Sequence, residues 1–249
     1  MNPVLRWFHQ LGSPPYFYRF AGRWMPWFGW SALLLGALGL YLGMVRAPAD
    51  YLQGDSFRII YIHVPCAWMS LFVYVVLAVN GTIALIWRIK LSELLLLACA
   101  PVGAMFTAIT LITGMLWGKP TWGAYWVWDA RLTSELVLLF LYFGVIGLAS
   151  AYDDVRQGAR AAAVLALVGV VNVPIIHFSV KWWNTLHQGE TVRIFGQSSI
   201  DASMVWPLLV MALATKLYFA FAVLLRTRGL LLEQERAKQW ARDAVTGAT

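Results

Sequence analysis

Long apolar segments alternate with short polar connections along the whole chain. Each segment is close to the roughly 20 residues that a helix needs to cross about 30 Å of hydrocarbon. The pattern therefore predicts an all-α integral membrane protein with six transmembrane helices, which form a single domain over residues 1–249. The predicted spans cover about residues 27–45, 59–80, 93–116, 132–151, 160–180 and 203–225. Residues 226–249 follow as a short tail, in which the run LLLEQERAKQWARD from Leu230 predicts a short amphipathic helix.

The composition agrees with a membrane protein. Of the 249 residues, 60% are hydrophobic and 12% are charged, whereas about a quarter of the residues in a soluble domain are charged. The residues before the first apolar segment are aromatic and basic, and no small-residue cleavage site follows that segment. We therefore expect a retained first span rather than a cleaved signal peptide.

The distribution of Lys and Arg predicts the orientation, because cytoplasmic loops carry the excess of positive charge. The first, third and fifth loops and the adjoining span ends hold Arg46, Arg58, Lys119, Arg131, Lys181 and Arg193. The N-terminus, the second and fourth loops and the tail hold Arg6, Arg19, Arg23, Arg88, Lys90, Arg156, Arg160, Arg226, Arg228, Arg236, Lys238 and Arg242. We therefore expect both termini in the cytoplasm. The net charge of +7 then reflects topology and contact with membrane lipid, and no nucleic acid is expected as a partner.

The same count places a tryptophan-rich stretch, WGKPTWGAYWVWDARLT, in the third loop on the outer face. Interfacial anchoring is one interpretation, because indole rings favour the headgroup zone. An anchoring belt would be spread over many helix ends, however, and this loop alone holds four of the fourteen tryptophans. The stretch comprises Trp117, Trp122, Trp126 and Trp128, followed by Asp129 and Arg131.

A large planar ligand is the second interpretation of this loop. If Pro120 opens a short helix on the membrane surface, Trp122 and Trp126 share one face at i and i+4. We refer to this predicted flat aromatic surface as the platform. Arg58 and Arg131, both expected near the outer boundary, would then pair with carboxylates of the ligand. The alternative role for either arginine is an anchor at the interface or a partner for Asp129.

Two of the four histidines are predicted at the same outer face. His63 lies about one helical turn inside the outer end of the second span, and His187 lies in the fifth loop after Trp182 and Trp183. Two opposed imidazoles can complete the axial positions of a haem iron. A buried histidine that only forms hydrogen bonds is the other interpretation. His177, near the outer end of the fifth span, competes with His187.

A loop carries a ligand over a platform more easily than a helix end does, which favours His187. His9 is predicted on the cytoplasmic side.

Other chemical motifs are absent from the sequence. There is no phosphate-binding loop of the G-x-x-x-x-G-K-[ST] type, and Cys66 and Cys99 stand alone in apolar spans, which argues against thiol redox chemistry. Lys216 lies deep in the last span, so we expect it to pair, to snorkel or to face a partner subunit.

Three sequence runs carry a resemblance to a known family. WGKPTWGAYWVWDARLTSELV is similar to the tryptophan-rich WWD signature of haem-handling membrane proteins. With RIIYIHVPCAW before it and NVPIIHFSVKWWNTLHQG after it, the chain resembles the CcmC family of cytochrome c maturation. The resemblance extends over essentially the whole chain, including the number of spans.

The resemblance implies a haem-handling subunit of c-type cytochrome biogenesis in the bacterial inner membrane. Non-covalent, transient haem b would lie on the outer loop at the periplasmic face, between the histidines that match His63 and His187. It would then be loaded onto the haem chaperone CcmE, to which it becomes covalently attached. The implied partners are CcmE, CcmD and the ATP-binding cassette subunits CcmA and CcmB. This role is presentation and transfer, without enzymatic turnover.

Two other functions compete with this expectation. A b-type electron-transfer cytochrome often has histidine pairs at two membrane depths, and no inner-leaflet pair is present in the sequence. A haem transporter subunit that moves haem across the bilayer would show polar or broken-helix features along a midplane path. Only Lys216, Asn172 and a few prolines qualify as such features.

Overall fold

The structure is a computed structural model, and it describes residues 12–187 and 200–246. Arg6, His9 and Arg193, which entered the predictions above, lie outside the described residues. The described secondary structure is helical apart from one isolated β-bridge between Asp50 and Gly54.

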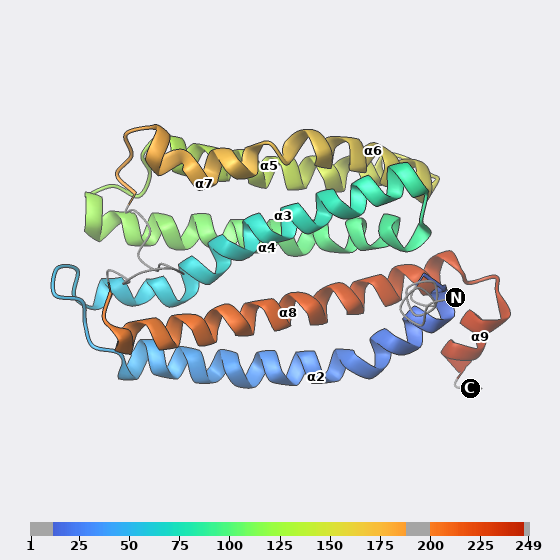
Figure 1. The fold of residues 1–249 in the computed structure, drawn as a ribbon, viewed down its shortest axis with the longest axis horizontal. Helices are drawn as coiled ribbons and strands as arrows, with labels where there is room; N and C mark the ends of the chain where they lie inside the picture. The colour runs from blue at the N-terminus through green and yellow to red at the C-terminus, as the bar shows by residue number, and fades with distance from the viewer. Residues whose placement is uncertain (1–11, 188–199, 247–249) are drawn as a thin grey trace, which may run out of the picture.

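The helices run nearly parallel to one long axis (Figure 1). Six helical segments of the described chain are long and apolar enough to cross a membrane, which confirms the predicted all-α multipass fold. Each of the six predicted segments overlaps one of them. The helices are α2 (Pro14–Tyr41, continued by a π-helical turn Leu42–Arg46), α3 (Ile60–Trp87, preceded by a 3-10 turn Asp55–Ile59), α4 (Lys90–Trp122), α5 (Ala130–Ser150), α6 (Val155–Gly169), α7 (Asn172–Trp182), α8 (Ala202–Gln234) and α9 (Gln239–Thr246).

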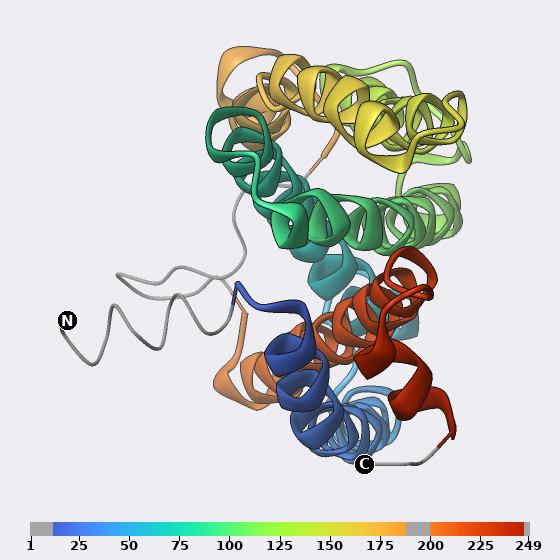
Figure 2. The same ribbon diagram turned by 90° about the vertical axis from the view of Figure 1, so that its right-hand side faces the viewer.

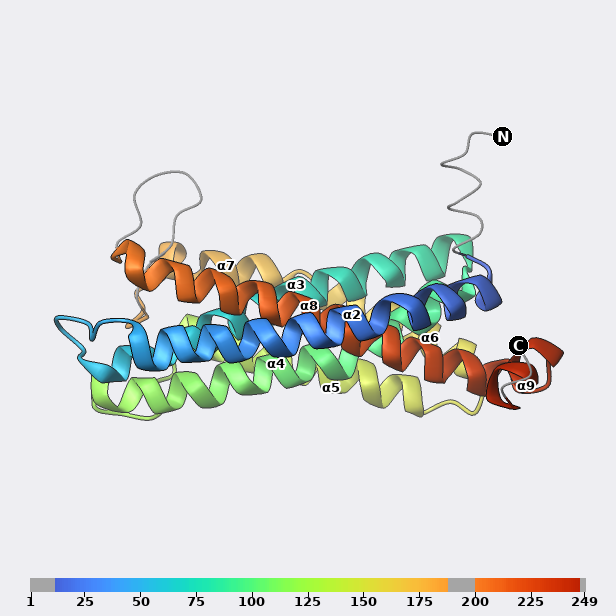
Figure 3. The same ribbon diagram turned by 90° about the horizontal axis from the view of Figure 1, so that it is seen from below.

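The bundle has two parts. Helices α3 to α7 form one group, and α2 pairs with α8, which itself packs on α3 and α4 (Figures 1 and 2). Both described chain ends lie at the same end of the bundle (Figure 3). We call this the terminal end, and we call the opposite end, where α4 stops and α5 begins, the tryptophan end.

Small residues allow two buried tyrosines to fill the core of the larger group. A Cβ atom on Gly103 would lie 2.2 Å from the Tyr142 ring, and one on Gly169 would lie 2.1 Å from the Tyr74 hydroxyl oxygen. The two rings meet edge to face with centroids 4.9 Å apart. Close helix approach at small residues is the usual way in which membrane helices pack.

The fifth membrane span is interrupted between α6 and α7. Pro174 has no backbone N–H to donate to the carbonyl of Val170, four residues earlier. The N–H of Val173 donates to that carbonyl instead, at 3.0 Å, and Asn172 Nδ2 donates to the carbonyl of Ser134 on α5 at 2.9 Å. The break therefore keeps its backbone groups satisfied and ties α7 to α5.

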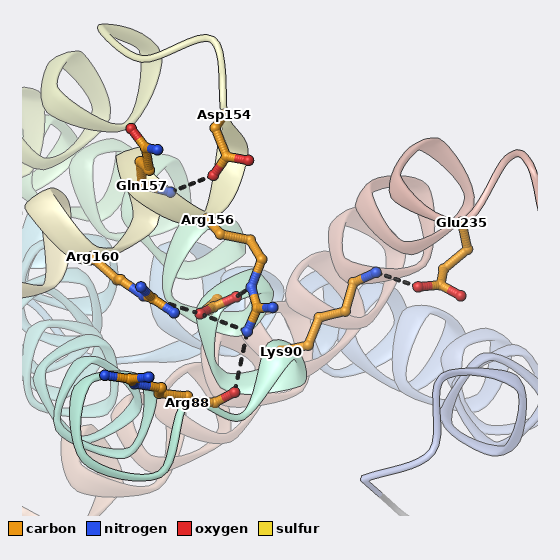
Figure 4. A network of polar contacts seen from close by, with 8 residues as sticks. Arg88, Lys90, Asp154, Arg156, Gln157, Arg160 and Glu235 are labelled. Carbon is orange, nitrogen blue, oxygen red and sulfur yellow. Dashed lines mark hydrogen bonds and ion pairs between the residues drawn. The ribbon is translucent and has the colours of Figure 1, made fainter.

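At the terminal end, Glu93 of α4 is buried and holds two arginines of α6 (Figure 4). Its Oε2 lies 2.9 Å from Arg156 Nε, and its Oε1 lies 3.8 Å from Arg160 Nε. Arg156 Nη2 also donates to the carbonyl of Arg88 at 3.3 Å. One carboxylate thus joins the connection between α3 and α4 to the beginning of α6.

The predicted tail helix from Leu230 is wrong in its boundaries, and the buried carboxylate of Glu235 explains why. Residues from Leu230 to Gln234 belong to α8, and a new helix begins only at Gln239. Between them, Glu235 binds Lys90 of α4 (Figure 4). Its other carboxylate oxygen lies 2.6 Å from Lys238 Nζ. Burial opposes ionisation of Glu235, but the hydrogen bonds from Lys238 and Lys90 outweigh it and lower the pKa of the carboxyl below its ordinary value. The turn is therefore held by long-range ion pairs that a local pattern does not reveal.

Replacing Glu93 with glutamine is expected to lower the free energy of unfolding by about 1–3 kcal/mol, because a buried hydrogen-bonded carboxylate loses its charge between two arginines. Both arginines are partly exposed, so the lower part of this range is expected. Denaturant unfolding of the purified protein in detergent measures the loss. The matched control is Asp153→Asn at an exposed position beside α6, and an equal loss in that control would contradict the role of Glu93.

Candidate functional site

The tryptophan stretch connects α4 to α5 at the tryptophan end, and its local sequence explains both helix boundaries. Gly123 adopts a left-handed conformation with φ of 80°, and its N–H donates to the carbonyl of Lys119 at 3.1 Å, which ends α4. Asp129 is the N-cap of α5, since its Oδ1 accepts from the N–H of Leu132 at 2.8 Å. Residues 124–129 between these caps are not helical.

The predicted surface helix beginning at Pro120 is therefore wrong. Pro120 lies in the last turn of α4, and the helix stops at Trp122 because Gly123 caps it. Trp122 and Trp126 do not share a helical face as the platform required. Trp126 instead packs edge-on against Trp128, with centroids 5.3 Å apart.

A cavity of about 200 Å³ lies at this end, between α3, α4, α5 and α7. Most of its walls are apolar, which is the usual character of a small-molecule site. Five of the predicted site residues contribute to the walls, together with the competing His177 and the buried Glu135. The five are His63, Trp117, Trp122, Arg131 and His187.

His63 and His187 are neighbours in the cavity, although more than a hundred residues separate them in the sequence. Their ring centroids are 6.3 Å apart, and the ring planes differ by 33°. His63 is buried and His187 is partly buried. Trp117 meets His63 edge to face at 5.6 Å, and Trp122 lies 6.5 Å from His187. Two imidazoles and two indoles thus share one small volume.

Thr113 of α4 sets the orientation of the His63 ring. The Thr113 hydroxyl donates its single proton to the carbonyl of Ile109 at 2.6 Å. Its oxygen lies 3.0 Å from His63 Nδ1, so it accepts a hydrogen bond from the Nδ1–H. In the tautomer that donates from Nδ1, the neutral ring keeps on Nε2 the lone pair that binds a metal.

Gly114 provides the space for this ring. A Cβ atom at this position would lie 3.2 Å from His63 Cε1 and 3.7 Å from Nδ1. The first separation is tighter than ordinary van der Waals contact. Because Gly114 has no Cβ atom, the His63 imidazole can lie close against the backbone of α4.

Asp129 connects the tryptophan stretch to the segment that carries His187. Its Oδ2 accepts a hydrogen bond from the Thr185 hydroxyl, and the Thr185 oxygen accepts one from the backbone N–H of His187 at 3.0 Å. One carboxylate therefore caps α5 and positions the second histidine. Asp129 thus acts on the backbone of the two segments.

Arg131 lies in the cavity wall, where its guanidinium binds a backbone carbonyl. Its Nη1 donates to the carbonyl of Ile176 at 2.9 Å, which holds α5 against α7. Glu135 accepts a hydrogen bond from the Ser70 hydroxyl at 2.7 Å. Among the described residues, no ion pair joins Arg131 to Asp129 or Glu135.

The remaining predicted residues lie outside the cavity walls. Arg58 is held by Asp55 at 2.8 Å and donates to the carbonyl of Gly43 at 3.0 Å. Trp182 and Trp183 are exposed, with Trp182 stacked on Phe178 at 5.2 Å. Trp126 and Trp128 contact each other, as described above. Arg58 is therefore held by its contacts with Asp55 and with the Gly43 carbonyl, and it does not line the cavity.

Four residues of the site had no signal in the sequence. Thr113, Gly114 and Thr185 support the histidines, and Gln53 accepts a hydrogen bond from Trp117 Nε1 at 2.7 Å. Each is a common residue type whose role depends on a partner from another element. Thr113 and Gly114 lie about one turn before the end of a predicted span. Small and hydroxylated residues are frequent in membrane helices, so this position alone does not indicate a site.

The comparisons with known proteins agree on one family. Residues 7–242 match the model of CcmC, described as Heme exporter protein C. The Heme exporter protein C of Escherichia coli strain K12 is 50% identical over 237 residues, which cover 95% of this chain and 96% of that protein. The protein of the same name from Bradyrhizobium diazoefficiens is 48% identical over 224 residues, with 90% and 85% covered.

A mitochondrial protein of Arabidopsis thaliana, named as ccmC-like and for cytochrome c biosynthesis, is 44% identical over 179 residues, which cover 72% of this chain and 67% of that protein. A family model that matches nearly the whole chain and relatives at this identity are decisive for membership. The chain therefore belongs to the CcmC family of heme exporter proteins.

Proposed function

We propose that this protein holds haem at the tryptophan end, with His63 and His187 as the axial ligands of the iron, and passes it to the haem chaperone CcmE. The facing imidazoles of these two residues carry the proposal. Two imidazoles that share one metal through bonds of about 2 Å have ring centres roughly 6 Å apart, and the observed separation is 6.3 Å. The free lone pair of His63 Nε2 supports the same role.

The size and lining of the cavity favour presentation of the cargo over storage. The cavity volume of about 200 Å³ is smaller than the roughly 300–1,000 Å³ of pockets that bury a drug-sized ligand. Haem is at least as large as such a ligand, so the cavity does not enclose it completely. One edge of the macrocycle would therefore remain outside the walls, accessible to a second protein. Trp117 and Trp122 offer ring surfaces to the buried part, and Arg131 offers a guanidinium to a propionate.

The charge distribution favours a periplasmic position for the site. The positive residues gather at the terminal end, where α3 meets α4 and α5 meets α6, and the cytoplasmic side of a membrane protein carries this excess. Both termini would then be cytoplasmic, in the bacterial inner membrane. The names of the relatives support haem export for cytochrome c biogenesis. The resemblance adds CcmD, CcmA and CcmB as partners and transient, non-covalent haem b as the cargo.

Spectroscopy of the purified protein, followed by transfer, tests this function. Protein isolated with haem is expected to show the low-spin visible and electron paramagnetic resonance signals of bis-imidazole ligation. Added chaperone without haem is then expected to acquire the haem, without hydrolysis of ATP by this chain. A high-spin spectrum would contradict the ligand assignment. A correct spectrum without any transfer would contradict the delivery role.

Replacing Gly114 with alanine is expected to reduce the haem retained on purification severalfold. The added methyl group would lie 3.2 Å from His63 Cε1, so the ring must move by a few tenths of an ångström away from its position opposite His187. Haem per protein, measured as the pyridine haemochrome, reports the effect. Gly147→Ala is the matched control, because a Cβ atom there meets nothing within 4 Å, and equal retention in both variants would argue against a positioning role for Gly114.

A further inference from the structure

Lys216 is an exposed cation in the middle of a membrane-spanning helix. The apolar part of α8 extends from Ala202 to Leu225, and Arg226 is the first cationic residue after Lys216. The ten residues from Lys216 to Arg226 correspond to roughly 15 Å along the helix axis. A lysine stem of four carbons covers only part of that distance, so its ammonium group does not reach the headgroups by snorkelling.

Among the residues that the structure describes, no carboxylate pairs with Lys216. The acidic residues of the chain are Asp50, Asp55, Glu93, Asp129, Glu135, Asp153, Asp154, Glu190, Asp201, Glu233, Glu235 and Asp243. Glu190 lies outside the described residues. Of the eleven that the structure describes, ten lie in connections, in the tail or in the end turns of helices. The other, Glu135, is buried in α5 toward the tryptophan end and accepts a hydrogen bond from Ser70. A second copy of the chain has the same deficit, so self-association would not neutralise Lys216 either.

Lys216 belongs to a face of α8 that the bundle leaves uncovered. Another side of α8 contacts α2, through Phe221 beside Gly29 and Ala214 beside Gly36. A further side contacts α3, where Phe219 meets Phe72 at 5.7 Å (Figure 2). The uncovered face has the spacing i, i+3, i+7, i+10 and i+14 of a helix-packing stripe. Its exposed members are Trp206, Leu209, Leu213 and Lys216, and the partly buried Ala220 continues the spacing.

We propose that this α8 face is a subunit interface, and that it binds a transmembrane helix of a different protein that carries an aspartate or glutamate at the depth of Lys216. Apolar side chains on the stripe alone would be compatible with lipid. A lysine facing hydrocarbon is costly, however, and ionisable groups at this depth are paired or functional. A carboxylate from a partner helix supplies both the charge and the hydrogen-bond acceptors that the ammonium group needs.

Site-specific crosslinking in living cells tests the interface. The photoreactive amino acid benzoylphenylalanine replaces Leu213, one turn from Lys216, in the full-length protein expressed with its native partners. The control position is Val168, which is exposed in the middle of the membrane span Val155–Trp182. We expect a crosslinked product at position 213 and none at 168. The peptide attached at 213 is expected to come from a transmembrane segment that contains a carboxylate.

Charge reversal then separates the ion pair from simple proximity. Lys216→Glu is expected to reduce the crosslinked product more than about tenfold, as loss of a desolvated charge pair does, whereas Lys216→Arg retains it. Replacing the captured carboxylate with lysine is expected to restore the product in the Lys216→Glu background. Haem content of the purified variants shows that the site at the tryptophan end is intact. Capture of lipid or of a second copy alone, or a product insensitive to Lys216→Glu, would overturn the proposal.

Discussion

Replacing both His63 and His187 with alanine is expected to leave the protein without haem when it is purified from haem-replete cells. The two ring centroids are 6.3 Å apart in a mostly apolar cavity, and no group of three or more His, Cys, Asp or Glu residues in the described part of the chain offers an alternative metal site. Without either imidazole, only ring stacking and the propionate contacts would remain. The single variants are expected to lose most of their haem and to regain part of it in buffer that contains imidazole, because the small base fills the vacated position.

His177 provides the matched control for this prediction. It also lines the cavity, and its own ring contact is with Phe178, with centroids 4.7 Å apart. The His177→Ala variant is therefore expected to retain haem and the low-spin spectrum. Haem that is retained by the double variant would contradict the assignment of both ligands. Haem that is lost in His177→Ala but retained in His187→Ala would assign the second ligand to His177.

Replacing Asp129 with alanine is expected to decrease the affinity for haem by about tenfold or more, the effect usual for a group that positions a metal ligand. Asp129 binds no cargo in this account. Its Oδ2 holds Thr185, which in turn holds the backbone of His187. Loss of the α5 cap alone would cost only about 1 kcal/mol of stability. The expected result is thus a large effect on haem titration with a small shift in thermal unfolding.

Two further variants separate positioning from capping. Asp154→Ala removes the equivalent N-cap of α6, where the side chain accepts from the N–H of Gln157 at 2.8 Å, at the end of the bundle away from the cavity. It should shift unfolding to a similar extent and leave haem affinity unchanged. Thr185→Val should reproduce the affinity loss of Asp129→Ala, whereas Thr185→Ser should retain haem. Equal haem affinity in Asp129→Ala and Asp154→Ala would exclude the positioning role.

The sequence alone determined the fold class and the number of spans, because each helix that crosses hydrocarbon must satisfy its own backbone and present an apolar surface along a fixed length. These are local requirements, and a run such as residues 93–116 meets them without reference to its neighbours. The charge pattern and the excess of tryptophan were equally local, so the sequence also predicted which loops to consider together. The family signature in residues 117–137 was another local feature.

Only the tertiary structure decided which side chains meet in the cavity and what supports them. Thr113 of α4 contacts His63 of α3, and Thr185 links the His187 backbone to Asp129 at the start of α5. Contacts between different elements leave no periodic pattern in the sequence. Arg58 is held away from the cavity by a local ion pair with Asp55 and by the carbonyl of Gly43 in the preceding helical turn. The expected surface helix failed for a conformational reason: Gly123 permits a left-handed turn that ends α4, whereas Pro120 is equally compatible with the last turn of one helix and the first turn of another.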